Sequence, residues 1–258
     1  MKLAINNQLC LNIGMKVIPI LFTYDDMMET YPNRDSFNSF LRRSLKAGNI
    51  KQIKRGLYAL VNPSTGMIYA SKFQIASKLF DDSYFSYHEA IEYYGLATQS
   101  FVSHFTYLTH VYVKDIDFEE NIYSSKKSTC DLEILDHMKE NGTRVVSLER
   151  AIVDSIDNIG YAGGLEEVEN ALDSCGNLHL EKVIKMLEYY DKAFLYQKVG
   201  YLFEKHFGSR IPDSFYQLCL EKSGNKIQYF EANVGFAKLV LKWKLMVPKE
   251  RSMPDELF

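Results

Sequence analysis

Basic side chains gather in one short stretch near the start of this 258-residue chain. Residues 34–55 hold seven basic side chains and a single acid, Asp35. Residues 1–62 carry nine basic side chains and four acids, whereas residues 63–258 carry 21 and 29, so the net charge of −3 hides the cluster. Such an asymmetry indicates a nucleic-acid-binding segment joined to a part with another task.

The segment DSFNSFLRRSLKAG, residues 35–48, has the period of an amphipathic helix. Asp35 or Ser36 can cap its start, and Gly48 fits the position just beyond its last turn. One predicted face holds Phe37, Phe40, Leu41, Ser44 and Leu45, and the other holds Asn38, Ser39, Arg42, Arg43 and Lys46. A helix face that is merely solvated usually mixes acids with bases in i,i+4 pairs. This face carries positive charges only, which favours an anionic partner over a face that is merely solvated.

The elements expected around this helix have a recognisable order. Thr23 with Asp25 and Asp26 predicts a first helix that ends near Tyr31, ahead of Pro32. Residues 50–53 and 57–61 predict a hairpin whose turn contains Gly56. Helix, turn, cationic helix and basic hairpin is the layout of a winged helix-turn-helix, a geometry that suits the major groove of B-DNA.

The chemistry of the side chains divides the expected contacts with DNA. Arg is bidentate to guanine and Asn to adenine, so one group is assigned to base edges: Asn38, Ser39, Arg42 and Arg43. A second group is assigned to phosphates: Lys46, Lys51, Lys54 and Arg55. The predicted interface also includes Arg34 and Ser36 at the start of the helix.

The turn-rich residues 62–66 predict a junction between two domains. We expect an α+β protein, with a winged helix-turn-helix domain over residues 1–62 and a larger mixed α/β domain over residues 67–258. No stretch reaches about 18 consecutive apolar residues, and polar residues interrupt the apolar N-terminal segment, so we expect a cytoplasmic protein that does not enter a membrane.

The main alternative is a metal-dependent nucleic-acid enzyme, because Asp115 and Asp117 have the spacing of two Mg²⁺ ligands on one strand face. No Gly-Ser element precedes this pair, and the chain has no P-loop and no nucleophile-elbow or zinc-protease motif. Glu149 and Arg150 are expected to form an ion pair. We therefore expect no catalytic activity, metal or cofactor, and four reduced, inert cysteines. A pure protein-interaction module is a third possibility.

Four segments carry a family resemblance: IKRGLYAL, YFSYHEAIEYYGL, VVSLERAIVDSID and FLYQKVGYLFEKHF, which begin at residues 53, 84, 145 and 194. In this order they resemble the AbiEi-type antitoxins of type IV toxin–antitoxin systems, over roughly residues 20–210. The resemblance implies that the N-terminal domain binds inverted repeats in its own promoter and represses the operon. It implies that the C-terminal domain counteracts a nucleotidyltransferase toxin without a stable complex. Its implied DNA contacts are the helix of residues 36–46 and the wing of residues 51–55, and it assigns no neutralising residues.

Overall fold

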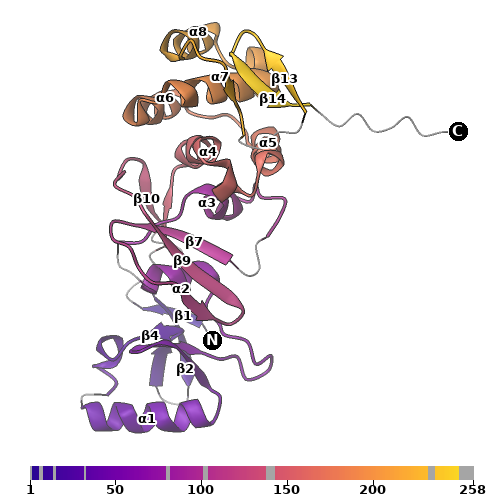
Figure 1. Cartoon of the computed structure of the whole chain (residues 1–258). Helices are drawn as coiled ribbons and strands as arrows, with labels where there is room; N and C mark the ends of the chain where they lie inside the picture. Colours follow the sequence, from indigo (N-terminus) through magenta and orange to yellow (C-terminus); the bar gives the residue numbers. More distant parts are fainter. Residues whose placement is uncertain are drawn as a thin grey trace, which may run out of the picture. The chain divides into compact units, whose positions relative to one another are not determined.

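The computed structural model describes residues 2–5, 8–13, 16–31, 33–79, 82–100, 104–137, 143–231 and 236–249. Two compact units divide the chain: the first comprises Met1–Glu89 and Phe101–Ser147, and the second comprises Ala90–Ser100 and Leu148–Phe258. Helices and small sheets occur in both (Figure 1), as expected for an α+β protein. The expected junction at residues 62–66 is a turn that lies inside the first unit.

The first unit begins with two small sheets. Strands β1 (Lys2–Ile5), β2 (Gln8–Ile13) and β3 (Lys16–Pro19) form an antiparallel sheet that our sequence analysis did not predict. Strand β4 (Leu21–Phe22) pairs with the hairpin of β5 (Ile50–Lys54) and β6 (Leu57–Leu60), in the order β4–β6–β5. The predicted hairpin is therefore confirmed, and α1 (Arg34–Lys46) packs against its strand β5.

The first helix expected before α1 is only one 3₁₀ turn, η1 (Asp25–Met27), followed by the turn of residues 28–30. Thr23 Oγ1 accepts a hydrogen bond from the Asp26 amide (3.3 Å). The Asp26 carboxylate folds back to accept one from the Thr23 amide (2.8 Å). This reciprocal pair fixes the start of the turn, and the helical segment ends at Met27. Met27 and Tyr31 are then both buried without a regular helix between them, and Pro32 lies outside the described residues.

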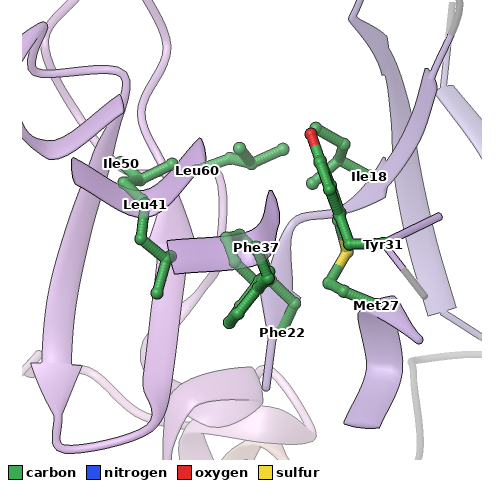
Figure 2. Close-up of a cluster of buried hydrophobic side chains, with 8 residues drawn as sticks. All are labelled: Ile18, Phe22, Met27, Tyr31, Phe37, Leu41, Ile50 and Leu60. Carbon is green, nitrogen blue, oxygen red and sulfur yellow. The ribbon is translucent and has the colours of Figure 1, made fainter. Parts of the chain in front are cut away.

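A core of aromatic and aliphatic side chains joins these elements (Figure 2). Phe37 of α1 packs edge-to-face on Phe22 of β4, with ring centroids 6.4 Å apart, and Leu41 is buried one helical turn further on. Aromatic pairs of this geometry contribute about 0.5–1.5 kcal/mol beyond the area that they bury. The remaining core residues come from β3, η1, the following turn and the hairpin: Ile18, Met27, Tyr31, Ile50 and Leu60. This core fixes which face of α1 points inward.

The first unit continues with α2 (Lys72–Leu79) and a sheet of order β7–β9–β8. Strands β7 (His104–Thr109) and β9 (Asn121–Lys127) are parallel, and β8 (Ile116–Phe118) returns antiparallel to β9. A further hairpin pairs β10 (Ile134–His137) with β11 (Thr143–Val146). The helix α3 (Tyr87–Tyr93) begins in this unit and ends in the second.

The second unit is mainly helical and is built around α7 (Ala193–Phe207), which packs against three other helices, α4 (Leu148–Asp157), α5 (Leu165–Ser174) and α8 (Asp213–Lys222). α6 (Leu180–Tyr190) packs on α4. Two 3₁₀ turns, η3 (Ile159–Ala162) and η4 (Gly208–Arg210), connect helices. The unit ends in a sheet of order β12–β14–β13, formed by Gln228–Tyr229, Leu245–Pro248 and Ala237–Val240. No helix of the described residues is long and apolar enough to cross a membrane.

Buried polar groups join α4 to its neighbours in the second unit. The expected ion pair between Glu149 and Arg150 is wrong, because adjacent helix residues point in different directions. Arg150 pairs instead with Asp154 one turn later (3.2 Å), and the Tyr190 hydroxyl donates to the same carboxylate. Glu149 accepts a hydrogen bond from the amide of His179 (3.0 Å). Glu149, Arg150 and Asp154 are buried, and their polar bonds join α4 to the segments packed around it.

The turn between β13 and β14 closes against α7 through Trp243, which is 1% exposed. Its indole Nε1 donates to Glu204 (2.7 Å), and its ring lies directly over Gly200. A Cβ added at Gly200 would overlap the six-membered ring of Trp243. Three ring atoms would lie within 3 Å of it, and the farthest of them, Cε3, would be 2.9 Å away. A glycine is therefore required at this point of a buried helix.

We expect Gly200→Ala to lower the free energy of unfolding by about 1–3 kcal/mol, because the added methyl group overpacks the contact with Trp243. Chemical denaturation measures this change. In a Trp243→Ala background the same substitution should become neutral or stabilise by up to about 1 kcal/mol, since alanine has the better helix propensity. Gly176→Ala is the control, because its Cβ meets open space. Equal effects of Gly200→Ala in both backgrounds would contradict the steric explanation.

Candidate nucleic-acid interface

The helix α1 is defined by hydrogen bonds at both ends. Asn33 caps its start, because its side-chain oxygen accepts a hydrogen bond from the amide of Ser36 (2.9 Å); the expected cap by Asp35 or Ser36 is therefore wrong. The helix begins at Arg34, so the cap lies two or three residues earlier than we predicted. Gly48 follows the last turn at φ +71°, as expected, and the amide of Asn49 donates to the carbonyl of Ser44 (2.9 Å).

The outward face of α1 presents the cations that we assigned to DNA. Asn38, Arg42, Arg43 and Lys46 are exposed, and Ser39 is half-buried between them. The guanidinium of Arg43 donates to the Ser39 carbonyl (3.2 Å). Within the described part of the chain, Arg42, Arg43 and Lys46 form no ion pair with an acid. We call the five residues 38, 39, 42, 43 and 46 the cationic face.

Two further residues of the predicted interface lie at the start of α1. Arg34 is exposed, and its guanidinium lies over the ring of Tyr24, 5.1 Å from the centroid. Ser36 is exposed as well, and its amide is engaged by the cap. At the other end of the helix, Leu45 was expected on the packing face, but it is 39% exposed. Only Phe37 and Leu41 of α1 are buried, so the helix contributes a narrower packing stripe than predicted.

The hairpin provides fewer free cations than its sequence suggests. Arg55 is exposed in the turn, next to Gly56 at φ +86°. Lys51 instead forms an ion pair with Glu119 in the turn between β8 and β9 (2.6 Å). The ammonium group of Lys54 donates to the carbonyl of Leu79 at the end of α2 (2.7 Å). The ammonium group of Lys54 thus anchors the hairpin to α2 in the unbound protein, and its assignment to a phosphate stays a prediction.

The alternative catalytic site does not gather further ligands. Asp117 lies on β8, but Asp115 precedes the strand, so the two carboxylates do not share one strand face as expected. Both side chains are exposed. Among the described residues no three His, Cys, Asp or Glu side chains are arranged to hold a metal ion.

His110 forms the clearest titratable cluster of the first unit. Its Nδ1 lies 3.1 Å from Asp82 Oδ2, and its Nε2 lies 2.7 Å from Asp131 Oδ1. Hydrogen bonds to Asp131 and then to Asp82 raise the pKa of this imidazole. Burial opposes ionisation of Asp82, but the His110 amide and the Thr109 hydroxyl donate to it and its pKa is lowered. The imidazole directly follows the end of β7.

No protein-family model and no curated protein matches the chain. Among solved structures, it is similar to one described as the crystal structure of RV2827C protein from Mycobacterium tuberculosis. The TM-score is 0.65 and the sequence identity is 13%, with 89% of this chain and 86% of that chain covered. At this identity the similarity shows a common fold alone.

We expect the pKa of His110 to lie above the ordinary histidine value of about 6.5. Because the pKa of His110 is raised in the folded state, its protonated form stabilises the fold. This stabilisation is fully present below the unfolded-state pKa and is lost as pH rises through the folded-state pKa. A titration of the imidazole followed by NMR measures the midpoint, and His110→Asn identifies its signals. Asp131→Asn should lower the midpoint, since it removes the first of the two hydrogen bonds. A midpoint at or below the ordinary value would contradict the geometry.

Proposed function

We propose that the protein is a cytoplasmic DNA-binding repressor and antitoxin, with no catalytic activity of its own. In this proposal η1, α1 and the β5–β6 hairpin act as a compact winged helix-turn-helix. They bind inverted repeats in the promoter of the protein's own operon. The C-terminal part counteracts a nucleotidyltransferase toxin without forming a stable complex with it.

The observation that carries the DNA-binding part is the exposed cationic face of α1. A DNA-reading helix needs donors that remain free in the unbound protein, and Arg42, Arg43 and Lys46 have no acidic partner among the described residues. The major groove is about 12 Å wide and admits one helix. The buried Phe37 and Leu41 hold the opposite face of α1 on the core, so the whole cationic face remains available for the groove.

The contacts divide by chemistry and by exposure. Arg42 and Arg43 are assigned to guanine edges and Asn38 to adenine, with Ser39 beside them. Lys46 and Arg55 are assigned to phosphates, because both are exposed and unpaired within the described chain. Lys51 contributes only if phosphate displaces Glu119. Lys54 anchors the hairpin through its hydrogen bond to the carbonyl of Leu79 at the end of α2.

The antitoxin part is supported by the resemblance to the AbiEi-type antitoxins alone. Its motif VVSLERAIVDSID covers the end of β11 and the whole of α4, and FLYQKVGYLFEKHF covers almost all of α7. Most residues of these two helices are buried. The motifs therefore indicate a common scaffold, and residues that act on a toxin would have to lie outside them.

We expect the Arg42→Ala/Arg43→Ala double variant to lose sequence-specific DNA binding, at a cost of about 1–3 kcal/mol for each Arg that contacts a base. The measurement is a gel shift with a duplex from the region upstream of the gene, with scrambled DNA as competitor. Lys222→Ala, an exposed lysine of α8, is the matched control and should bind as the wild type does. Co-expressed with its toxin, the double variant should still protect cells. Wild-type affinity that is equal for the upstream and scrambled duplexes would overturn the repressor proposal.

We expect Arg55→Ala to weaken binding to all DNA sequences alike and to reduce the slope of log K against log salt by about 0.9 for the lost phosphate contact. Filter binding at several salt concentrations measures the slope. Lys54→Ala should leave the slope nearly unchanged, because its ammonium is engaged at Leu79. A larger slope change for Lys54→Ala than for Arg55→Ala would show that the hairpin meets DNA in another conformation.

A further inference from the structure

Asp35, the single acid of α1, has a carboxylate that the fold does not use. Asn33 provides the cap that we expected from Asp35 or Ser36, so the first turn is satisfied without it. The side chain of Asp35 is exposed and forms no hydrogen bond or ion pair to any residue that the structure describes. The helix dipole favours an acid in the first turn of α1 on any side of the helix. The dipole therefore does not explain on which side this carboxylate stands.

Asp35 stands on the side of α1 that we assign to DNA. An α-helix turns by about 100° per residue, so residues 35, 42 and 46 lie within about 40° of one another around the axis. They form a stripe along the cationic face, from the first turn of the helix to the last. Asn38 and Ser39 flank this stripe. The acid of α1 thus lies in line with two of its basic residues, and all three are exposed.

An acid in this place restricts how α1 can lie on DNA. Phosphates carry the negative charge of the duplex, and they repel a carboxylate that is brought beside them. In helix-turn-helix proteins the N-terminal residues of the recognition helix contact the base edges. Asp35 is the second residue of α1, so this geometry turns its carboxylate toward base edges instead of phosphates.

The base edges in the major groove differ in what they offer to a carboxylate. An ionised Asp only accepts hydrogen bonds. Guanine presents the acceptors N7 and O6, and thymine presents the acceptor O4 and a methyl group, so neither base offers a donor. Adenine presents its N6 amino group beside the acceptor N7, whereas cytosine presents its N4 amino group. Cytosine is therefore the base that best matches Asp35.

We propose that Asp35 is a specificity-determining residue that accepts a hydrogen bond from the N4 amino group of a cytosine in each half-site. The inference rests on the proposed DNA binding by α1 and adds a base preference that the cationic face does not supply. Arg42 and Arg43 select guanine and Asn38 selects adenine, whereas Asp35 also rejects guanine and thymine, which leave its carboxylate without a donor.

The test selects bound duplexes from a random-sequence library, with the full chain and with two variants, and sequences them. Wild-type sites should contain a cytosine–guanine pair whose replacement weakens binding at least about fivefold. Asp35→Ala should lose this preference and keep the others. Asp35→Asn should change the preferred base from cytosine to adenine, because an amide is bidentate to adenine. A purely structural role of Asp35 would not produce such a switch.

Glu29→Gln is the matched control, because Glu29 is an exposed acid in the turn before α1 and lies outside the helix. It changes the net charge as Asp35→Asn does, and it should select the same sequences as the wild type. The altered side chains are all exposed, so each variant should unfold cooperatively near the wild-type melting temperature, which circular dichroism measures.

The outcomes separate this inference from the proposed function. Identical selected sequences from the wild type and both Asp35 variants would overturn the role of Asp35 and leave DNA binding by α1 in place. Loss of the cytosine preference in Glu29→Gln as well would assign the effect to net charge and would also overturn that role. A wild-type protein that selects no sequence would overturn the proposed function and this inference together.

Discussion

The packing of Phe37 and Leu41 against β4 and the β5–β6 hairpin is the contact on which the N-terminal architecture depends. A helix that buries one stripe must turn the opposite stripe to solvent, and in α1 that opposite stripe holds Arg42, Arg43 and Lys46. The aromatic rings thus determine where the charges point. Because the rings lie in a close-packed cluster, rotation of α1 about its axis would require several of them to move together.

The local elements here could be predicted from the sequence, whereas the partners of their polar groups could not. The local sequence pattern was sufficient for α1 and for the hairpin, because each pattern is strong. It failed at Asp25–Met27, where the expected helix is a single 3₁₀ turn. The two faces of α1 follow the predicted pattern except at Leu45, which was expected to pack but is 39% exposed.

Long-range contacts account for the other errors. Lys51 meets Glu119 and Lys54 meets Leu79, which lie 68 and 25 residues away in the chain. Sequence periodicity does not predict contacts between residues so far apart in the chain, so we expected both lysines to be free. The contact between Trp243 and Gly200 is also long-range. The local sequence does not show that the turn between β13 and β14 places an indole over this glycine. The fold class could therefore be read from local pattern, but the number of free cations in the candidate site could not.

The bond between Lys54 and the end of α2 also affects how the hairpin meets any ligand. A free two-stranded hairpin is only marginally stable in water. Here one strand is held by an ammonium group at a helix end and by the ion pair of Lys51, so the tip that carries Arg55 is ordered before any encounter. Ordering on folding rather than on binding reduces the entropy lost in the complex. Recognition at this tip should consequently resemble rigid docking, with little dependence of the association rate on loop rearrangement.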